Sequence, residues 1–189
     1  YYLIDDMLVD TGSGYYDDYL TSQLEKHGVK PEDIKELKDL AKLTFTCKQD
    51  LRDTYPYGLF AVPLEDVIRL HASSGTTGKQ IVVGYTQNDI DIWSQSVARA
   101  IVAAGGSDED VLQVAYGYGL FTGGLGAHDG AQRLGATVVP MSTGNSKKLT
   151  TMMVDFGATA IACTPSYLLH LSEVLRDEGL LDQIKLKCA

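Results

Sequence analysis

Seven consecutive residues, Ser73–Lys79, offer the kinds of group that bind a polyphosphate. Gly75 and Gly78 allow a tight turn that brings backbone N–H donors close to an anion. Four hydroxyl side chains add further donors, and Lys79 adds a mobile positive charge. The run predicts a phosphate-binding loop, and its candidate ligands are Ser73, Ser74, Gly75, Thr76, Thr77, Gly78 and Lys79.

This loop differs from the two common nucleotide-binding motifs. The P-loop pattern requires Gly where Ser73 stands and Ser or Thr where Gln80 stands. No G-x-G-x-x-G sequence opens a helix here, so the dinucleotide pattern is absent as well. The alternative interpretation is a polar hairpin between strands at 67–72 and 81–85. Four hydroxyls and a lysine are more than a turn requires, which favours phosphate binding.

Two further segments follow predicted strands and could form a pocket. The segment Tyr116–Gly126 combines five glycines with three aromatic side chains. The aromatic rings could floor a binding pocket, whereas the glycines could equally allow close packing of the helix that follows. The segment Thr164–Tyr167 opens a helix and could hold an anion or simply cap that helix.

The pattern of apolar residues predicts the elements that position these segments. Residues 15–27, 31–42 and 48–55 are predicted helices, so residues 1–66 form a mostly helical N-terminal segment. From residue 67 on, strands alternate with helices. Expected strands at 111–115, 136–141 and 158–163 are each separated by one helix, which favours right-handed crossovers. We therefore expect an α/β fold in which 67–189 form a largely parallel sheet flanked by helices.

Composition narrows the function further. The 189 residues carry a net charge of −9, and Lys and Arg are not clustered, which argues against a nucleic-acid partner. Three cysteines and four histidines are scattered, so no metal site is predicted and the thiols are expected to be reduced. No leader sequence and no long apolar run is visible, so we expect a cytoplasmic protein without a membrane partner.

Three motifs in one order resemble the adenylate-forming superfamily of acyl- and aryl-CoA ligases. They are Ser73–Lys79, Tyr116–Gly126 and Cys163–Tyr167, and within the superfamily they resemble the phenylacetate–CoA ligase family. The resemblance runs from about Gly28 to the end of the chain. It implies ATP, Mg²⁺ and coenzyme A as reactants, and a loop that holds the β- and γ-phosphates. It also implies that Tyr116 and Phe121 contact an aryl-acid ring and that Tyr167 lies beside the acyl pocket.

The resemblance also implies that important parts lie beyond Ala189. The adenine-binding Gly-Ala-Glu-Pro stretch, the ribose-binding Asp and the mobile C-terminal domain with its catalytic lysine are expected there. We therefore expect an N-terminal portion of a ligase that is inactive alone, with the remaining part as its partner. The family tends to dimerise, so a homodimer is possible.

Some residues depart from the family pattern. Gln80 stands where these ligases usually have Pro, and Asp129 follows His128 where they usually have an aromatic residue. A carboxylate near a site for ATP and a carboxylate substrate would repel both. The departures leave open a non-catalytic binding or assembly module that retains the ligase fold. An unrelated α/β nucleotide-binding protein would require all three motif matches to be accidental.

Overall fold

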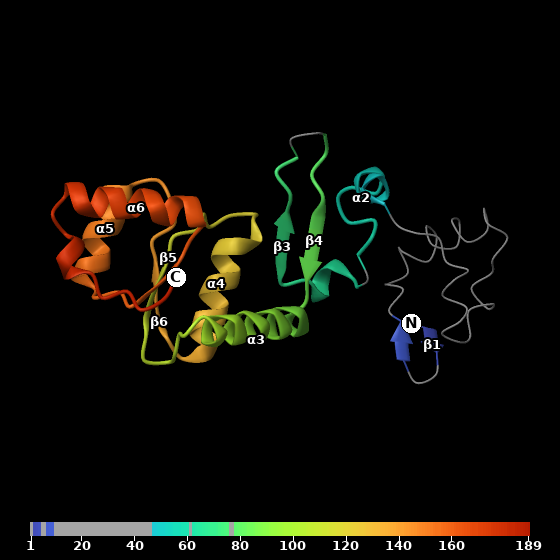
Figure 1. Ribbon diagram of the computed structural model, residues 1–189. Helices are drawn as coiled ribbons and strands as arrows, with labels where there is room; N and C mark the ends of the chain where they lie inside the picture. The colour runs from blue at the N-terminus through green and yellow to red at the C-terminus, as the bar shows by residue number, and fades with distance from the viewer. Residues whose placement is uncertain (1, 5–6, 10–46, 61, 76–77) are drawn as a thin grey trace. The chain divides into compact units, whose positions relative to one another are not determined.

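The computed structural model describes residues 2–4, 7–9, 47–60, 62–75 and 78–189 (Figure 1). The chain divides into two compact units, Tyr1–Gln87 and Asn88–Ala189. The helices predicted at 15–27 and 31–42, together with Thr76 and Thr77, lie outside the described residues. The domain boundary predicted between residues 66 and 67 stays a prediction.

In its described residues, the first unit contains two antiparallel strand pairs and short helical turns. Its elements are β1 (Tyr2–Ile4), β2 (Met7–Val9), α2 (Lys48–Asp53), the 3-10 helix η3 (Leu64–Asp66), β3 (Arg69–Ala72) and β4 (Val82–Tyr85). Strand β1 pairs with β2, and β3 pairs with β4. In the second hairpin Arg69 lies opposite Tyr85 and Ala72 lies opposite Val82. The segment Ser73–Lys79 is therefore part of the connection between two paired strands.

The second unit is built on a parallel sheet of three strands in the order β6–β5–β7. Its strands are β5 (Val111–Val114), β6 (Thr137–Pro140) and β7 (Ala160–Ala162). Its helices are α3 (Gln87–Ala103), α4 (Thr122–Leu134), α5 (Ser146–Asp155), α6 (Pro165–Asp177) and the 3-10 turn η4 (Leu181–Gln183). The predicted α/β class with a parallel sheet flanked by helices is confirmed.

Helices cover both faces of this sheet. Side chains alternate along its central strand β5, so each face receives side chains that pack against a helix. Leu112 and Val114 of β5 pack with Ala131 of α4 on one face. Gln113 points to the other face, where its side-chain amide donates to the Leu149 carbonyl of α5 at 2.9 Å. Helices α5 and α6 cover that second face together (Figure 1), and their buried apolar side chains are Leu149, Met153, Leu171 and Leu175.

A buried carboxylate ties the strands together at their amino ends. Asp110 precedes β5 and is only 2% exposed. Its carboxylate accepts hydrogen bonds from Thr159 at 2.6 Å and from the Lys187 ammonium at 3.1 Å. Its backbone carbonyl accepts from Thr137 N–H of β6 at 2.9 Å. These hydrogen bonds lower the pKa of Asp110 well below its usual range. Asp110 thus anchors the amino edge of the sheet, and the Tyr116–Gly126 segment begins at the opposite, carboxyl edge.

Candidate functional site

The hydroxyl-rich connection between β3 and β4 is closed at its base by Ser73. Ser73 N–H donates to the Ile81 carbonyl at 2.9 Å, and Ile81 N–H donates to Ser73 Oγ at 3.0 Å. Ser73 Oγ therefore serves as an acceptor that narrows the loop, while its own O–H remains a donor. Of the other described candidate ligands, Ser74, Gly78 and Lys79 are exposed.

The glycines of this loop are required by its backbone. Gly75 has φ +67° and Gly78 has φ +139°, and residues other than glycine rarely adopt backbone angles in this region. Gly78 N–H donates to the Gly75 carbonyl at 3.1 Å, which forms a tight turn. The hairpin interpretation explains these two glycines, but it gives no role to the exposed Ser74 and Lys79. Among the described residues of the loop, these two exposed side chains are available to an anion.

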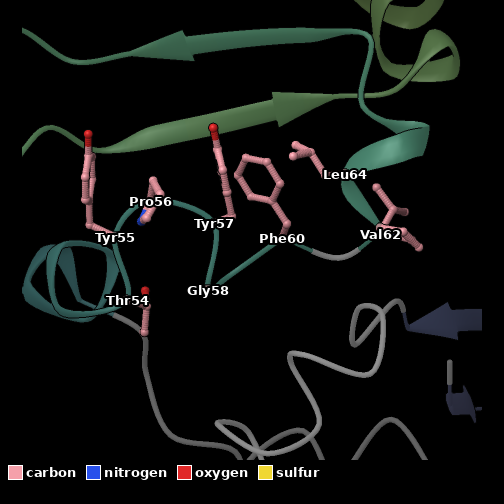
Figure 2. A pocket seen from close by; sticks show the side chains of 9 residues that line it. Thr54, Tyr55, Pro56, Tyr57, Gly58, Phe60, Val62 and Leu64 are labelled. Carbon is pink, nitrogen blue, oxygen red and sulfur yellow. The ribbon is translucent and has the colours of Figure 1, made fainter.

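Lys79 lies against an aromatic ring of the preceding segment. Its Nζ is 5.8 Å from the centre of the Tyr55 ring, which is within the range of a cation–π contact. Tyr55 also lines a pocket of about 510 Å³, shown in Figure 2. The other lining residues are Thr54, Pro56, Tyr57, Gly58, Phe60, Val62, Pro63 and Leu64. This predominantly apolar pocket lies within one short segment of the first unit.

A second group of candidate residues meets at the carboxyl edge of the parallel sheet. Tyr116 follows β5, and its hydroxyl donates to the Cys163 carbonyl after β7 at 2.9 Å. Tyr167, in the first turn of α6, shares a hydrogen bond of 3.1 Å with Ser146 at the start of α5. The loops after all three strands are thus joined by side-chain hydrogen bonds. Ligands of open α/β sheets bind at this kind of edge.

Phe121 is not joined to this group by a hydrogen bond, because its side chain is a hydrocarbon. It directly precedes α4 and is 58% exposed. An exposed aromatic ring of this size is available to contact an apolar ligand. The structure therefore holds Tyr116 and Tyr167 by two separate hydrogen bonds and leaves Phe121 on the surface of the same unit.

Two side chains that follow strands β5 and β7, Tyr118 and Cys163, have raised pKa values. The Tyr118 hydroxyl lies 3.2 Å from His128 Nδ1, and the two rings meet edge to face. Burial, with a smaller contribution from the Asp129 carboxylate, raises the pKa of Tyr118 to about 12. Burial also raises the pKa of the Cys163 thiol. Both groups therefore remain protonated at neutral pH, so neither supplies a base or a thiolate nucleophile.

The glycines after Tyr116 serve mainly to pack helix α4. A Cβ on Gly124 would lie 2.6 Å from the Gly117 carbonyl oxygen, and one on Gly126 would lie 2.6 Å from the Trp93 ring of α3. At Gly123 the nearest atom would be 3.5 Å away, which is an ordinary contact. These distances favour the packing interpretation for Gly124 and Gly126.

Sequence reasoning missed two residues that the structure brings to these sites. The one sequence signal for Ser146 is its position after a strand, in the first turn of α5. Tyr55 lies 24 positions before Lys79 in the numbering, and no local pattern relates them. Within the described ranges, no group of three or more His, Cys, Asp or Glu side chains could hold a metal ion. No described helix has the length and apolar character needed to cross a bilayer.

Comparison with known proteins identifies close relatives in sequence. The chain is 63% identical over 148 residues to phenylacetate-coenzyme A ligase of Escherichia coli K12, covering 78% of this chain and 34% of that enzyme. It is 60% identical over 153 residues to the enzyme of Pseudomonas putida, covering 81% of this chain and 35% of the relative. No family model matches the chain. The chain thus spans about a third of the length of these relatives.

Solved structures agree with this result. An open conformation of 2-hydroxyisobutyryl-CoA ligase, in complex with 2-HIB-AMP and CoA, matches with a TM-score of 0.77 and 28% identity. That match covers 92% of this chain and 43% of the other. The same ligase in its thioesterification state matches with a TM-score of 0.75 and 30% identity, covering 88% and 37%.

The chain therefore has the fold of a part of the adenylate-forming CoA ligases. Within that class, the predicted resemblance to the phenylacetate–CoA ligase family is confirmed over about a third of the relatives' length. A match of 148 residues in a chain of 189 leaves 189 − 148 = 41 residues outside it. The matched stretch must therefore include residues 42–148, which contain the hydroxyl-rich loop and the Tyr116–Gly126 segment.

Proposed function

We propose that the chain is part of an ATP-dependent aryl-acid CoA ligase that acts on a phenylacetate-like carboxylate. The observation that carries this proposal is the 63% identity to a phenylacetate–CoA ligase over a stretch that includes two of the three motifs. In the reaction, a carboxylate oxygen attacks the α-phosphorus of ATP and pyrophosphate leaves. The thiol of coenzyme A then attacks the acyl carbon, and AMP leaves.

The hydroxyl-rich loop is proposed to hold the β- and γ-phosphates and the departing pyrophosphate. Its ammonium and hydroxyls, with the backbone N–H groups of its turn, would stabilise negative charge. The proposed ligands are Ser73, Ser74, Gly75, Thr76, Thr77, Gly78 and Lys79. Mg²⁺ would bridge phosphate oxygens of the bound nucleotide.

The carboxyl edge of the parallel sheet is proposed to hold the acid. Tyr116 and Phe121 would contact its aromatic ring, and Tyr167 would lie beside the acyl group. The Tyr116 hydroxyl is already bonded to the Cys163 carbonyl, so its ring is held in place before the acid binds. A pocket wall that is fixed in advance loses less conformational entropy on binding.

We propose that this chain supplies only part of the active site, because it spans about a third of the length of its relatives. We propose that the remaining portion of a ligase supplies the adenine site and the catalytic lysine, and that the protein works in the cytoplasm and forms a homodimer. A non-catalytic module is the second candidate. Asp129 favours this candidate, because a carboxylate near the proposed acid site would repel a carboxylate substrate. After burial, this carboxylate is the second cause of the raised pKa of Tyr118.

Calorimetric titration of Mg-ATP and of phenylacetate into the chain tests this proposal, with Lys79→Ala as the matched control. We expect weak ATP binding that falls at least about ten-fold in Lys79→Ala, since a charge-assisted phosphate contact is lost. Phenylacetate binding should be unchanged by that substitution. If neither ligand binds, the non-catalytic module becomes the better interpretation.

Adding the complementary portion of a phenylacetate–CoA ligase tests the catalytic part separately. The mixture should catalyse exchange between ATP and pyrophosphate in the presence of phenylacetate. The Lys79→Ala chain should support less exchange under the same conditions. Exchange at equal rates with both chains would contradict the role of the loop.

A further inference from the structure

The contact between Lys79 and Tyr55 links the hydroxyl-rich loop to a segment that the motif does not contain. The ammonium lies 5.8 Å from the ring centre, and both side chains are exposed. Among the described residues Lys79 forms no salt bridge, and the Tyr55 ring is the group that its charge contacts. This partner comes from outside the loop.

The backbone beneath Tyr55 is held by hydrogen bonds. Thr54 N–H donates to the Asp50 carbonyl at 3.1 Å, and the Thr54 hydroxyl donates to the same carbonyl at 2.7 Å. Gly58 N–H donates to the Thr54 carbonyl at 2.8 Å, so the chain turns tightly after α2. A Cβ at Gly58 would lie 2.7 Å from that carbonyl oxygen, which shows how close the turn is. Tyr55 therefore projects from an ordered support.

The chemistry of an ammonium group allows it to serve a ring and an anion together. Lys carries three N–H donors, and a ring face occupies only one side of the group. The other side remains open to phosphate oxygens. A free lysine must give up rotamer freedom when it binds, and a contact made beforehand reduces that loss.

We propose that Tyr55 is a positioning residue for Lys79: its ring face holds the ammonium ready for the phosphates of a nucleotide. This inference rests on the proposed function of the loop. Tyr55 acts through Lys79 and makes no contact of its own with the phosphates. Because the contribution comes from the ring face, the hydroxyl of Tyr55 is dispensable.

Tyr57 provides a matched control within the same segment. Tyr55 and Tyr57 extend in the same direction and both line the pocket (Figure 2). They are similarly exposed, at 43% and 40%. The Tyr57 ring, however, packs on Phe60 with centres 5.1 Å apart. Replacing Tyr57 therefore disturbs the same pocket without removing the support of the lysine.

The test is calorimetric binding of Mg-tripolyphosphate, which presents phosphates without an adenine ring. Tyr55→Leu should weaken binding by about two- to five-fold, the range expected for an exposed cation–π contact. Tyr55→Phe should restore the affinity of the unmodified chain, and Tyr57→Leu should leave it unchanged. In a Lys79→Ala background, Tyr55→Leu should have no further effect, because the group it positions is gone.

The possible failures are distinguishable. If the unmodified chain does not bind tripolyphosphate, the phosphate role of the loop fails and this inference fails with it. If Lys79→Ala abolishes binding while Tyr55→Leu does not change it, only the role of Tyr55 is overturned. Equal losses in Tyr55→Leu and Tyr57→Leu, or a loss in Tyr55→Phe equal to that in Tyr55→Leu, would also overturn it. Circular dichroism of each variant confirms that the chain is folded.

Discussion

The candidate residues of the two units are held in place by different means. At the carboxyl edge of the parallel sheet, hydrogen bonds join Tyr116 to Cys163 and Tyr167 to Ser146, across 47 and 21 positions of the chain. In the β3–β4 hairpin, Lys79 is held by contact with one exposed ring. Two of the three residues proposed to meet the acid, Tyr116 and Tyr167, are thus fixed by the fold. The lysine proposed to meet the phosphates remains adjustable.

Two glycines, one in each unit, have equally close aromatic neighbours but differ in the free space around those neighbours. A Cβ on Gly126 would lie 2.6 Å from the Trp93 ring, and one on Gly84 would lie 2.6 Å from the Phe60 ring. Trp93 belongs to α3, which also packs closely on α4 at Gly130. Phe60 lines the pocket of about 510 Å³, so its ring has free space beside it. Similar contacts should therefore differ in their tolerance of substitution.

The largest expected effect comes from removing the anchor of the sheet. Asp110→Asn should lower the free energy of unfolding of the second unit by about 2–4 kcal/mol, because a buried, hydrogen-bonded charge is lost. Trp93, the only tryptophan of the chain, lies in this unit. Its fluorescence during urea unfolding measures the change. A loss below about 0.5 kcal/mol, typical of surface positions, would contradict the anchoring role.

The same carboxylate should make stability depend on pH. The pKa of Asp110 is lower in the folded chain than its usual value near 4, so the unfolded chain binds the proton first. The stabilisation is therefore fully present above about pH 4 and is lost progressively as the pH falls below that value. Asp110→Asn should remove this share of the acid sensitivity. An unchanged slope of stability against pH below 4 would contradict the assignment.

The paired glycines give an intermediate effect that tests the comparison directly. Gly126→Ala should destabilise the second unit by about 1–2 kcal/mol, since overpacking exceeds the gain in helix propensity. Gly84→Ala should cost the first unit less than about 1 kcal/mol, because the Phe60 ring can shift into the pocket. Hydrogen exchange of amides in β5 and in β4 reports on the two units separately. Equal losses would show that both regions are equally rigid.

Much of the second unit could be predicted from sequence, because its signals are local. One helix is expected between the strands at 111–115 and 136–141, and α4 (Thr122–Leu134) lies there. The strand at 111–115 differs from β5 by one residue. The contacts that define the site could not be predicted, because they join positions far apart in sequence. Ser146 reaches Tyr167 only because α5 and α6 lie on one face of the sheet.

The predicted loop shows a second limit of sequence reasoning. Glycine, hydroxyl and lysine side chains indicate phosphate chemistry wherever they occur together. They do not indicate that Ser73 Oγ accepts from the Ile81 N–H or that Lys79 rests on Tyr55. Both contacts depend on the pairing of β3 with β4 and on the turn after α2. Tertiary structure therefore divides one motif into residues that shape the loop and residues that remain free for a ligand.

A smaller effect than that of Gly126→Ala is expected for the hydrogen bond between Ser146 and Tyr167. Each hydroxyl is partly buried, so removing either one should cost about 0.5–1.5 kcal/mol. Ser146→Ala and Tyr167→Phe each delete one partner while keeping the shape of the side chain. Combined in one chain, they should cost less than the sum of the two, because they remove the same hydrogen bond. Urea unfolding followed by Trp93 fluorescence measures this coupling. If the two losses simply add, the hydrogen bond does not contribute, and the carboxyl edge is then held by the Tyr116–Cys163 contact and by packing of α5 on α6. In that case the edge proposed to bind the acid would be closer in rigidity to the loop proposed to bind phosphates than the geometry indicates.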